Sequence, residues 1–225
     1  LDRVEIRRRN LVSDAQMPYT LPTITPSESA TELDSGDYHA LFDRCLEDFG
    51  WSEKVKLQGK LVDGRYHGVS IGSFVEGGAA GPSENARIVL ETDGSFSVYV
   101  GSAALGQGIE TIMAQIAGDA LEVPFDRIRV RHGSTDHVTE GHGSYHSRST
   151  VMGGSAILLA VDELKERIRA VAAPALGCEP AEVMFDSNRT RGPSDTSLLF
   201  SEISDQPVEA EATFHNEKYT YAYGS

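Results

Sequence analysis

Two glycines bracket a glutamine at positions 106–108 and lead directly into an amphipathic stretch. Residues 96–103 alternate in polarity like a strand, and residues 109–121 carry apolar side chains at helical spacing. The first amides of a helix lack partners within the helix, and the helix dipole makes that end positive. Glycine also lets a ligand approach the backbone closely. Gly106, Gln107 and Gly108 therefore form either a plain strand-to-helix turn or a cradle for an anionic ligand.

A second helix start, at residues 143–150, offers comparable chemistry. It ends in Ser147, Arg148, Ser149 and Thr150, which supply three hydroxyls and one forked cation. Two such helix starts packed side by side would hold a phosphate-bearing cofactor. The same hydroxyl residues are also ordinary N-caps, and the glycine pair at 153–154 equally suits close helix packing. From the residues alone, both interpretations remain open.

Four histidines cluster in the intervening loop, but their spacing does not favour a metal site. They follow one another at intervals of five, five and four residues, which match no common zinc pattern, and no paired cysteines accompany them. We expect solvated loop histidines and no protein-ligated metal. No nucleophile-elbow, phosphate-loop or H-E-x-x-H motif is present, so no catalytic residue is assigned. The four are His132, His137, His142 and His146.

The elements around these motifs predict an α+β fold, with mixed sheet strands and two long helices. The first helix, 109–121, ends at Pro124 and gives way to a strand at 127–132. The second runs from about 151 to 173 and is also followed by a proline-containing turn and a strand. A helix–turn–strand unit is therefore repeated, at 120–130 and 175–185.

The N-terminal third has a different pattern. Residues 1–12 predict the end of a helix, residues 13–37 hold three prolines and predict an irregular crossing segment, and residues 38–50 predict a helix ending at Gly50. We therefore divide the chain into a region 1–65 of helix ends and irregular segment and an α+β region 66–225. The latter is expected to open with a strand over 66–77 and a hairpin over 86–103, which turns at Asp93-Gly94.

The charge balance limits the partners. The 225 residues carry 34 acids against 20 bases, a net charge of −14, and such a surface repels phosphate backbones, so we expect no nucleic-acid partner. No apolar run is long enough for a membrane span, and the charged N-terminus resembles no secretory signal. Two cysteines do not indicate a disulfide scaffold, so a cytoplasmic location is expected.

The ordered motifs resemble the molybdenum-cofactor region of the xanthine dehydrogenase, aldehyde oxidase and carbon monoxide dehydrogenase large subunits. That region carries a glycine-bracketed glutamine, a Q-x-A helix, a Leu-x-Val-Pro turn, a G-D-T and a serine-rich helix start. The corresponding residues here are Gly106-Gln107-Gly108 with Thr111, Gln115 and Ala117, then Leu121, Val123 and Pro124, Gly133-Ser134-Thr135, and Ser147-Arg148-Ser149-Thr150 before Gly154-Ser155-Ala156.

The resemblance implies a molybdenum hydroxylase, which oxidatively hydroxylates an electron-poor carbon of an aldehyde, N-heterocycle, purine or carbon monoxide, with water as the oxygen source. It implies a molybdopterin carrying molybdenum, in the cytosine dinucleotide form, and iron–sulfur and FAD centres on partner subunits or domains. By motif, Gly106, Gln107 and Gly108 would line the pterin and the outer face of the metal. Ser147, Arg148, Ser149 and Thr150 would hold the pterin or its pyrophosphate.

The departures from the family pattern are equally specific. The glycine-rich loop and the R-x-F-G element that normally precede this region are absent, as is the downstream Gly-Glu whose glutamate is the general base. The G-D-T reads Gly133-Ser134-Thr135. We therefore expect a part of a molybdopterin-binding subunit, inactive alone, whose partners are the remaining parts of the large subunit, the iron–sulfur and FAD subunits, and a small-molecule substrate. The alternative is a non-catalytic binding or assembly module that retains the fold.

Overall fold

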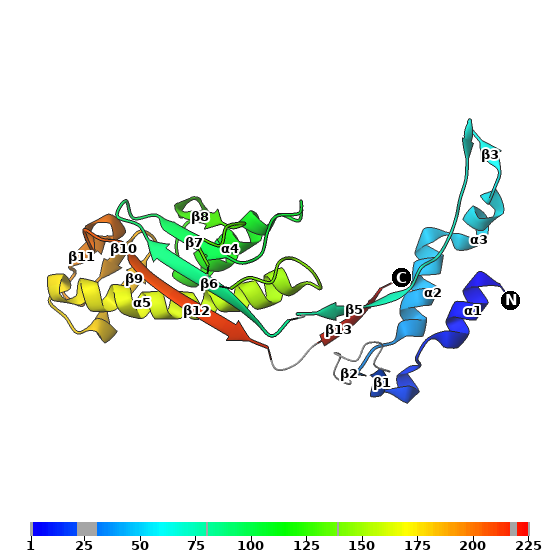
Figure 1. The fold of residues 1–225 in the computed structure, drawn as a ribbon, viewed down its shortest axis with the longest axis horizontal. Coiled ribbons are helices and arrows are strands. Elements are labelled where there is room, and N and C mark those ends of the chain that lie inside the picture. The colour runs from blue at the N-terminus through cyan, green and yellow to red at the C-terminus, as the bar shows by residue number, and fades with distance from the viewer. Residues whose placement is uncertain (1, 22–30, 80, 139, 217–219, 225) are drawn as a thin grey trace. The chain divides into compact units, whose positions relative to one another are not determined.

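The computed structural model describes residues 2–21, 31–79, 81–138, 140–216 and 220–224. The chain forms two units, one of residues 1–77 with 219–225 and the other of residues 78–218. The domain boundary predicted after residue 65 falls inside the first of these units. Figure 1 labels the elements of both.

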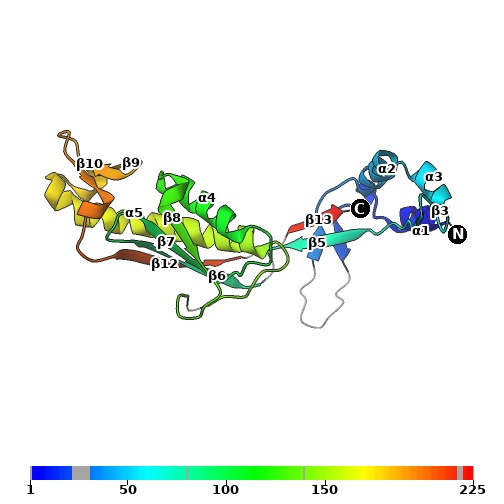
Figure 2. The same ribbon diagram turned by 90° about the horizontal axis from the view of Figure 1, so that it is seen from above.

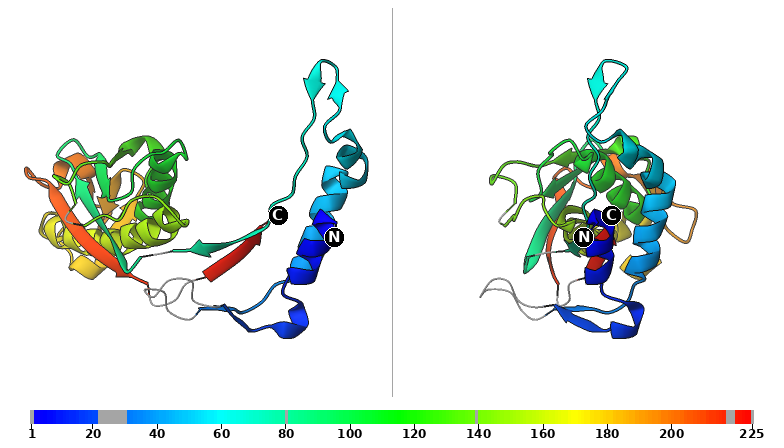
Figure 3. Two further views of the ribbon diagram at one scale, coloured as in Figure 1. Left: turned by 45° about the vertical axis from the view of Figure 1, so that its right-hand side comes forward. Right: turned by 90° about the vertical axis from the view of Figure 1, so that its right-hand side faces the viewer.

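The described residues of the first unit form the helices α1 (Arg3–Asn10), α2 (Tyr38–Phe49) and α3 (Trp51–Lys54). Helix α1 begins inside the described chain, because the Asp2 side chain caps it by accepting from the Val4 amide at 2.8 Å. The prediction of only a helix end at 1–12 was therefore wrong. Helix α2 ends as predicted, at Gly50 with a φ of 70°. Figure 3 shows α1 beside α2, where Arg8 forms an ion pair with Asp43.

The segment 13–37 is more regular than expected. It contains a 3₁₀ turn, η1 (Asp14–Gln16), and two short strands, β1 (Tyr19–Leu21) and β2 (Thr31–Leu33), which pair antiparallel. Part of the predicted irregular segment, 22–30, lies outside the described residues. The strands were missed because each is only three residues long and its pairing partner is distant in the sequence.

The strand predicted over 66–77 is shorter in the structure. Strand β3 (Leu61–Val62) pairs with β4 (Arg65–Tyr66), and a separate strand, β5 (Phe74–Gly78), pairs with β13 (Thr220–Gly224). Glycines at 68 and 72 lie between β4 and β5, and glycine weakens a strand interior. A 3₁₀ turn, η2 (Val55–Leu57), precedes β3.

The second unit is built on a mixed four-stranded sheet, in agreement with the predicted α+β class. Its order is β12-β6-β7-β8, with bounds Val208–His215, Ser83–Leu90, Phe96–Val100 and Ile128–Arg131. Strand β6 is antiparallel to both neighbours, whereas β7 and β8 are parallel. The predicted hairpin is confirmed: Gly94 has a φ of 81°, and the Asp93 carboxylate accepts from the Ser95 amide at 2.9 Å.

Two long helices, α4 (Ile109–Leu121) and α5 (Gly154–Leu176), cover one face of this sheet (Figure 2). Ile88, Val98, Met113 and Leu164 are among the fully buried side chains between sheet and helices. The glycine pair at the start of α5 faces α4. A Cβ on Gly154 would lie 2.9 Å from the Ile116 Cδ1 atom, so close helix packing, one of the two interpretations left open, is present.

The repeated helix–turn–strand unit is confirmed. Helix α4 ends at Leu121, its C-cap Glu122 is left-handed, and the chain continues past Pro124 through η3 (Phe125–Arg127) into β8. Helix α5 ends at Gly177 and continues through η5 (Pro180–Glu182) into β9. The repeat is local only, because β9 joins a second sheet of order β11-β10-β9. Its strands are β9 (Met184–Asp186), β10 (Arg189–Arg191) and β11 (Ser197–Leu199), and the 3₁₀ turn η6 (Phe200–Glu202) follows them. Among the described residues, no helix combines the length and apolarity needed to cross a membrane.

Candidate cofactor-binding site

The glycine-bracketed turn presents an uncapped helix start. Gly106 and Gly108 have φ values of 99° and 75°, left-handed conformations that favour glycine, and a Cβ on either would face open space. Helix α4 begins at Ile109, and no side chain caps it. No side chain at the Gly108 cap position therefore accepts from the first amides of α4.

Gln107 folds its side chain back across this turn. Its Oε1 atom accepts from the Leu105 amide at 2.5 Å, and its Nε2 atom donates to the Ala103 carbonyl at 3.0 Å. Nε2 also donates to the Ser144 hydroxyl at 3.3 Å. Ser144 is 37 positions away in the sequence, so this side chain ties the first turn to the loop that precedes α5.

Ser144 completes the link between the two helix starts. Its hydroxyl donates to the Ala103 carbonyl at 2.7 Å and accepts from the Ser149 hydroxyl at 3.1 Å. Ser149 lies at the second helix start, and Ala103 precedes the first. The side-by-side placement on which the cofactor interpretation depended is therefore present in the structure.

The second helix start has an irregular backbone. His146 and Ser147 have φ values of 44° and 53°, and the helix then opens with a π-helical segment, η4 (Ser149–Gly153), that runs into α5. No side chain caps η4. Ser147 and Thr150 are exposed, whereas Ser149 is buried. Wide turns of this kind occur frequently at functional sites.

Arg148 faces into the fold and not toward the turn surface. Its side chain is 0% exposed and forms an ion pair with Glu84, which is equally buried. Its guanidinium also donates to the Ser83 carbonyl at 2.6 Å and to the Gly143 carbonyl at 3.1 Å. These donors hold the loop together, and a role for Arg148 at a pterin or pyrophosphate remains a prediction.

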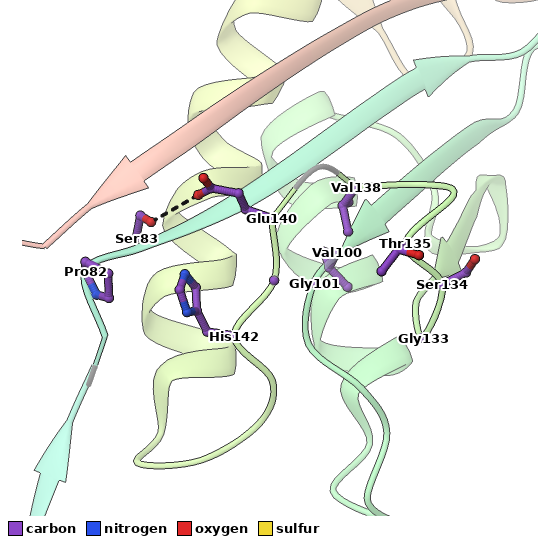
Figure 4. A pocket seen from close by; sticks show the side chains of 11 residues that line it. Pro82, Ser83, Val100, Gly101, Gly133, Ser134, Thr135, Val138, Glu140 and His142 are labelled. Atoms are coloured by element: carbon purple, nitrogen blue, oxygen red, sulfur yellow. Dashed lines mark hydrogen bonds between the residues drawn. The ribbon is translucent and has the colours of Figure 1, made fainter.

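A cavity of about 550 Å³ lies beside the site (Figure 4). It contains the Gly133-Ser134-Thr135 motif, and Glu140 accepts a 3.5 Å hydrogen bond from Ser83 within it. None of the residues predicted to bind cofactor lines this cavity, so sequence analysis missed it. The remaining lining residues are Pro82, Val100, Gly101, Val138, Gly141 and His142.

Two further residues, Glu84 and Ser144, were not predicted to contribute to the site. The sequence pattern around Glu84 could have indicated its role. Glu84 precedes Ala86 and Ile88 at intervals of two, so strand alternation places its carboxylate on the core face, where a charge needs a partner. Ser144 had no comparable signal, since a single loop serine is ordinary. Its importance comes from its hydrogen bonds with Ala103, Gln107 and Ser149.

The histidines are engaged separately and not as a cluster. His132 is hydrogen-bonded to Glu110 in the first turn of α4 at 2.8 Å, and this bond keeps the pKa of Glu110 below its ordinary value. The His137 ring lies 4.9 Å from the Tyr99 ring, centroid to centroid. Within the part of the chain that the structure describes, no three His, Cys, Asp or Glu side chains are arranged to hold a metal ion.

Comparison with known families gives a match over most of the chain. Residues 44–225 match the model of the molybdopterin cofactor-binding domain. Both helix starts and the whole second unit lie inside this range.

Curated relatives match over the full chain. The chain is 31% identical to the 6-hydroxypseudooxynicotine dehydrogenase complex subunit gamma of Paenarthrobacter nicotinovorans, covering 100% of this chain and 30% of that protein. It is 28% identical to the carbon monoxide dehydrogenase large chain of Hydrogenophaga pseudoflava, covering 100% of this chain and 31% of that protein. The chain therefore spans less than a third of the length of these relatives.

A solved structure shares the fold. Quinoline 2-oxidoreductase from Pseudomonas putida 86 superposes with a TM-score of 0.61 at 22% identity, covering 98% of this chain and 31% of that one. The family match and the relative at 31% identity show that the chain belongs to the molybdopterin cofactor-binding domain family of the molybdenum hydroxylase large subunits.

Proposed function

We propose that this chain is part of the molybdopterin-binding large subunit of a molybdenum hydroxylase. The intact enzyme would hydroxylate an electron-poor carbon of an aldehyde, N-heterocycle, purine or carbon monoxide, with water as the oxygen source. One observation carries the proposal: the Gln107–Ser144 hydrogen bond holds two uncapped helix starts together in a member of this family. Such a pair offers amide donors to an anionic cofactor.

The residues present suit that cofactor. The turn at Gly106 and Gly108 has room for a close approach, because a Cβ on either would meet no atom within 4 Å. Ser147 and Thr150 add exposed hydroxyls at the second start. When bound, the molybdenum–pterin group supplies the redox chemistry, and these residues bind and orient it. Arg148 and Ser149 are buried and would act indirectly, by holding the loop that contains Gly143 and Ser144 in place.

Gln107 has a specific role in this proposal. Both Nε2 hydrogens are accounted for by Ala103 and Ser144, and one Oε1 lone pair by the Leu105 amide. An amide oxygen has two lone pairs, so a second remains to accept from a pterin N–H. The loop bonds hold that oxygen at a fixed orientation before the cofactor arrives.

We further propose the cytosine dinucleotide form of the cofactor. The cavity of about 550 Å³ lies within the range of about 300–1,000 Å³ typical of ligand pockets, and it borders the loop that carries the second helix start. Glu140 makes this cavity unsuited to phosphate, because like charges repel. A carboxylate does accept from the exocyclic amine of cytosine, which supports placing the base there.

Electron transfer would require partners. An iron–sulfur cluster normally takes four cysteine thiolates, and this sequence has two cysteines, Cys45 and Cys178. We therefore propose that the iron–sulfur centres reside on partner subunits or domains, and we propose the same for FAD from the resemblance to the family. The name of one relative, a dehydrogenase complex subunit, supports a multi-subunit assembly.

The test is metal and pterin analysis of the intact subunit purified with its partners. We expect stoichiometric molybdenum by mass spectrometry and pterin by fluorescence after oxidation. Gln107→Ala should lower cofactor retention, whereas Gln206→Ala, at an exposed glutamine outside the motifs, should not. An intact subunit without molybdenum would show that the proposal is wrong.

A further inference from the structure

Glu84, which forms a buried ion pair with Arg148, has no part in the binding roles described so far. Both side chains are 0% exposed, and Arg148 is the largest fully buried side chain among the described residues. Removing two charges from water is unfavourable unless their hydrogen bonds are satisfied. A pair in this position is therefore weak as a source of stability, and its location points to another role.

Glu84 lies between the segments that lead to the two helix starts. On one side, a Cβ on Gly101 would collide with the Glu84 Oε1 atom, so the carboxylate is packed against the chain just before the first turn. On the other side, the carboxylate holds Arg148, which donates to the Gly143 carbonyl at 3.1 Å. One carboxylate thus contacts both approach segments.

The contacts continue without a break to the cofactor-facing residues. Gly143 is followed by Ser144, whose hydroxyl accepts from Gln107 and Ser149. Displacement of the Gly143 carbonyl would move Ser144 and with it the link between the helix starts. The Ser83 carbonyl, which accepts from Arg148 at 2.6 Å, anchors the same guanidinium to strand β6.

We propose that Glu84 is a positioning residue that, through Arg148, sets the spacing of the two helix starts for the cofactor. This inference rests on the proposed function for its ligand. Its geometric part concerns segments 101–108 and 143–150 and is measurable on its own. A second possibility, that the pair only stabilises the fold, makes different predictions.

The test compares three variants of the intact subunit in its complex. Glu84→Gln leaves Arg148 as an uncompensated buried charge, so it should lower the melting temperature. It should also speed pterin release about tenfold, as typically follows when a residue that orients a binding residue is lost. The double variant Glu84→Gln/Arg148→Met removes the unpaired charge, so the melting temperature should recover. Pterin release should remain about tenfold faster, because the hydrogen bond from the Arg148 guanidinium to the Gly143 carbonyl is then lost.

Ile168→Ala is the matched control for stability alone. Ile168 is fully buried in α5, so the change should lower the melting temperature without altering pterin release. Recovery of both stability and retention in the double variant would show that the pair only stabilises the fold, and the inference would be wrong. Release unchanged in Glu84→Gln would also contradict it.

Hydrogen exchange separates this inference from the proposed function. The rate of amide exchange should be higher in the double variant than in the unmodified subunit in both 101–108 and 143–150. An increase in only one of these segments would overturn the positioning role. This measurement does not require cofactor. Absence of pterin from the unmodified subunit would instead refute the proposed function, while the exchange comparison would still decide the positioning role.

Discussion

Gly101 and Gly141 touch backbone to backbone: a Cβ on Gly101 would lie 2.5 Å from the Cα atom of Gly141. The reverse approach is as close, at 2.7 Å from a Gly141 Cβ to the Gly101 Cα atom. Neither residue needs a left-handed φ, so glycine is required here for space and not for conformation. The contact fixes the end of β7 against the loop that leads to the second helix start.

Gly141→Ala should therefore lower the free energy of unfolding by about 1–3 kcal/mol, the usual cost of overpacking. The obstructing atoms belong to the backbone, which cannot move aside as a side chain can. Urea denaturation measures the change. Gly68→Ala is the control, since its Cβ would meet no atom within 4 Å, and it should stay within about 0.5 kcal/mol. Equal stability of the two variants would contradict the close approach.

Ser144→Ala removes the hydroxyl on which the link between the helix starts depends. Each lost hydrogen bond typically costs about 0.5–1.5 kcal/mol, and cofactor release from the intact subunit should accelerate. Ser155→Ala is a matched serine variant, because the Ser155 hydroxyl only donates to the Val151 carbonyl one turn earlier. Release rates measured by pterin fluorescence should change for Ser144 alone. A similar change in both would indicate a general effect of removing serine hydroxyls.

The Glu110–His132 hydrogen bond predicts a pH dependence. A carboxyl whose folded-state pKa lies below its ordinary value of 4.5 stabilises the fold above that pH, and the contribution is lost as the pH falls through the folded pKa. His132→Ala should raise the pKa of Glu110 toward 4.5 and reduce this contribution, while the backbone hydrogen bond that also lowers this pKa remains. The melting temperatures of variant and parent should differ at neutral pH and converge in acid. Nuclear magnetic resonance titration of Glu110 checks the pKa, and an unchanged value in the variant would refute the assigned cause.

Glu140→Gln tests the proposed place of the cytosine base. The amide keeps the shape of the carboxyl but weakens the acceptor, so retention of the dinucleotide cofactor by the intact subunit should fall. Chromatography of the cytidine monophosphate and pterin released on hydrolysis measures this retention. Glu202→Gln, in the distant turn η6, is the control and should leave it unchanged. Equal retention in both variants would place the base elsewhere.

Elements with a strong local pattern could be predicted from the sequence. Helix α4 and the β6–β7 hairpin have unbroken apolar periodicity and a turn with the residues it requires, so neighbouring residues were sufficient. Strands β1 and β2 depend on pairing with each other across other residues, and a three-residue strand carries almost no periodic signal. The extent of β5 was equally unpredictable, because its pairing partner β13 lies near the C-terminal end of this sequence.

The candidate site was predictable in composition but not in orientation. The residue types at 106–108 and 147–150 indicated two helix starts suited to an anion, and the structure brings these starts together. The sequence could not show that Arg148 faces inward, because its partner Glu84 lies 64 positions upstream. The local sequence of an arginine beside serines is the same whether its side chain faces a ligand or the core.

The π-helical opening of α5 makes the residues proposed to face the cofactor sensitive to chain length. Such a segment accommodates one residue more than a regular helix of the same rise, and each residue of an α-helix turns about 100° around the axis. Shortening Ser149–Gly153 by a single position would let regular helix extend through it and would rotate the residues before the deletion relative to α5. Thr150 would then turn around the axis, so a one-codon deletion would move its hydroxyl away from the proposed cofactor site.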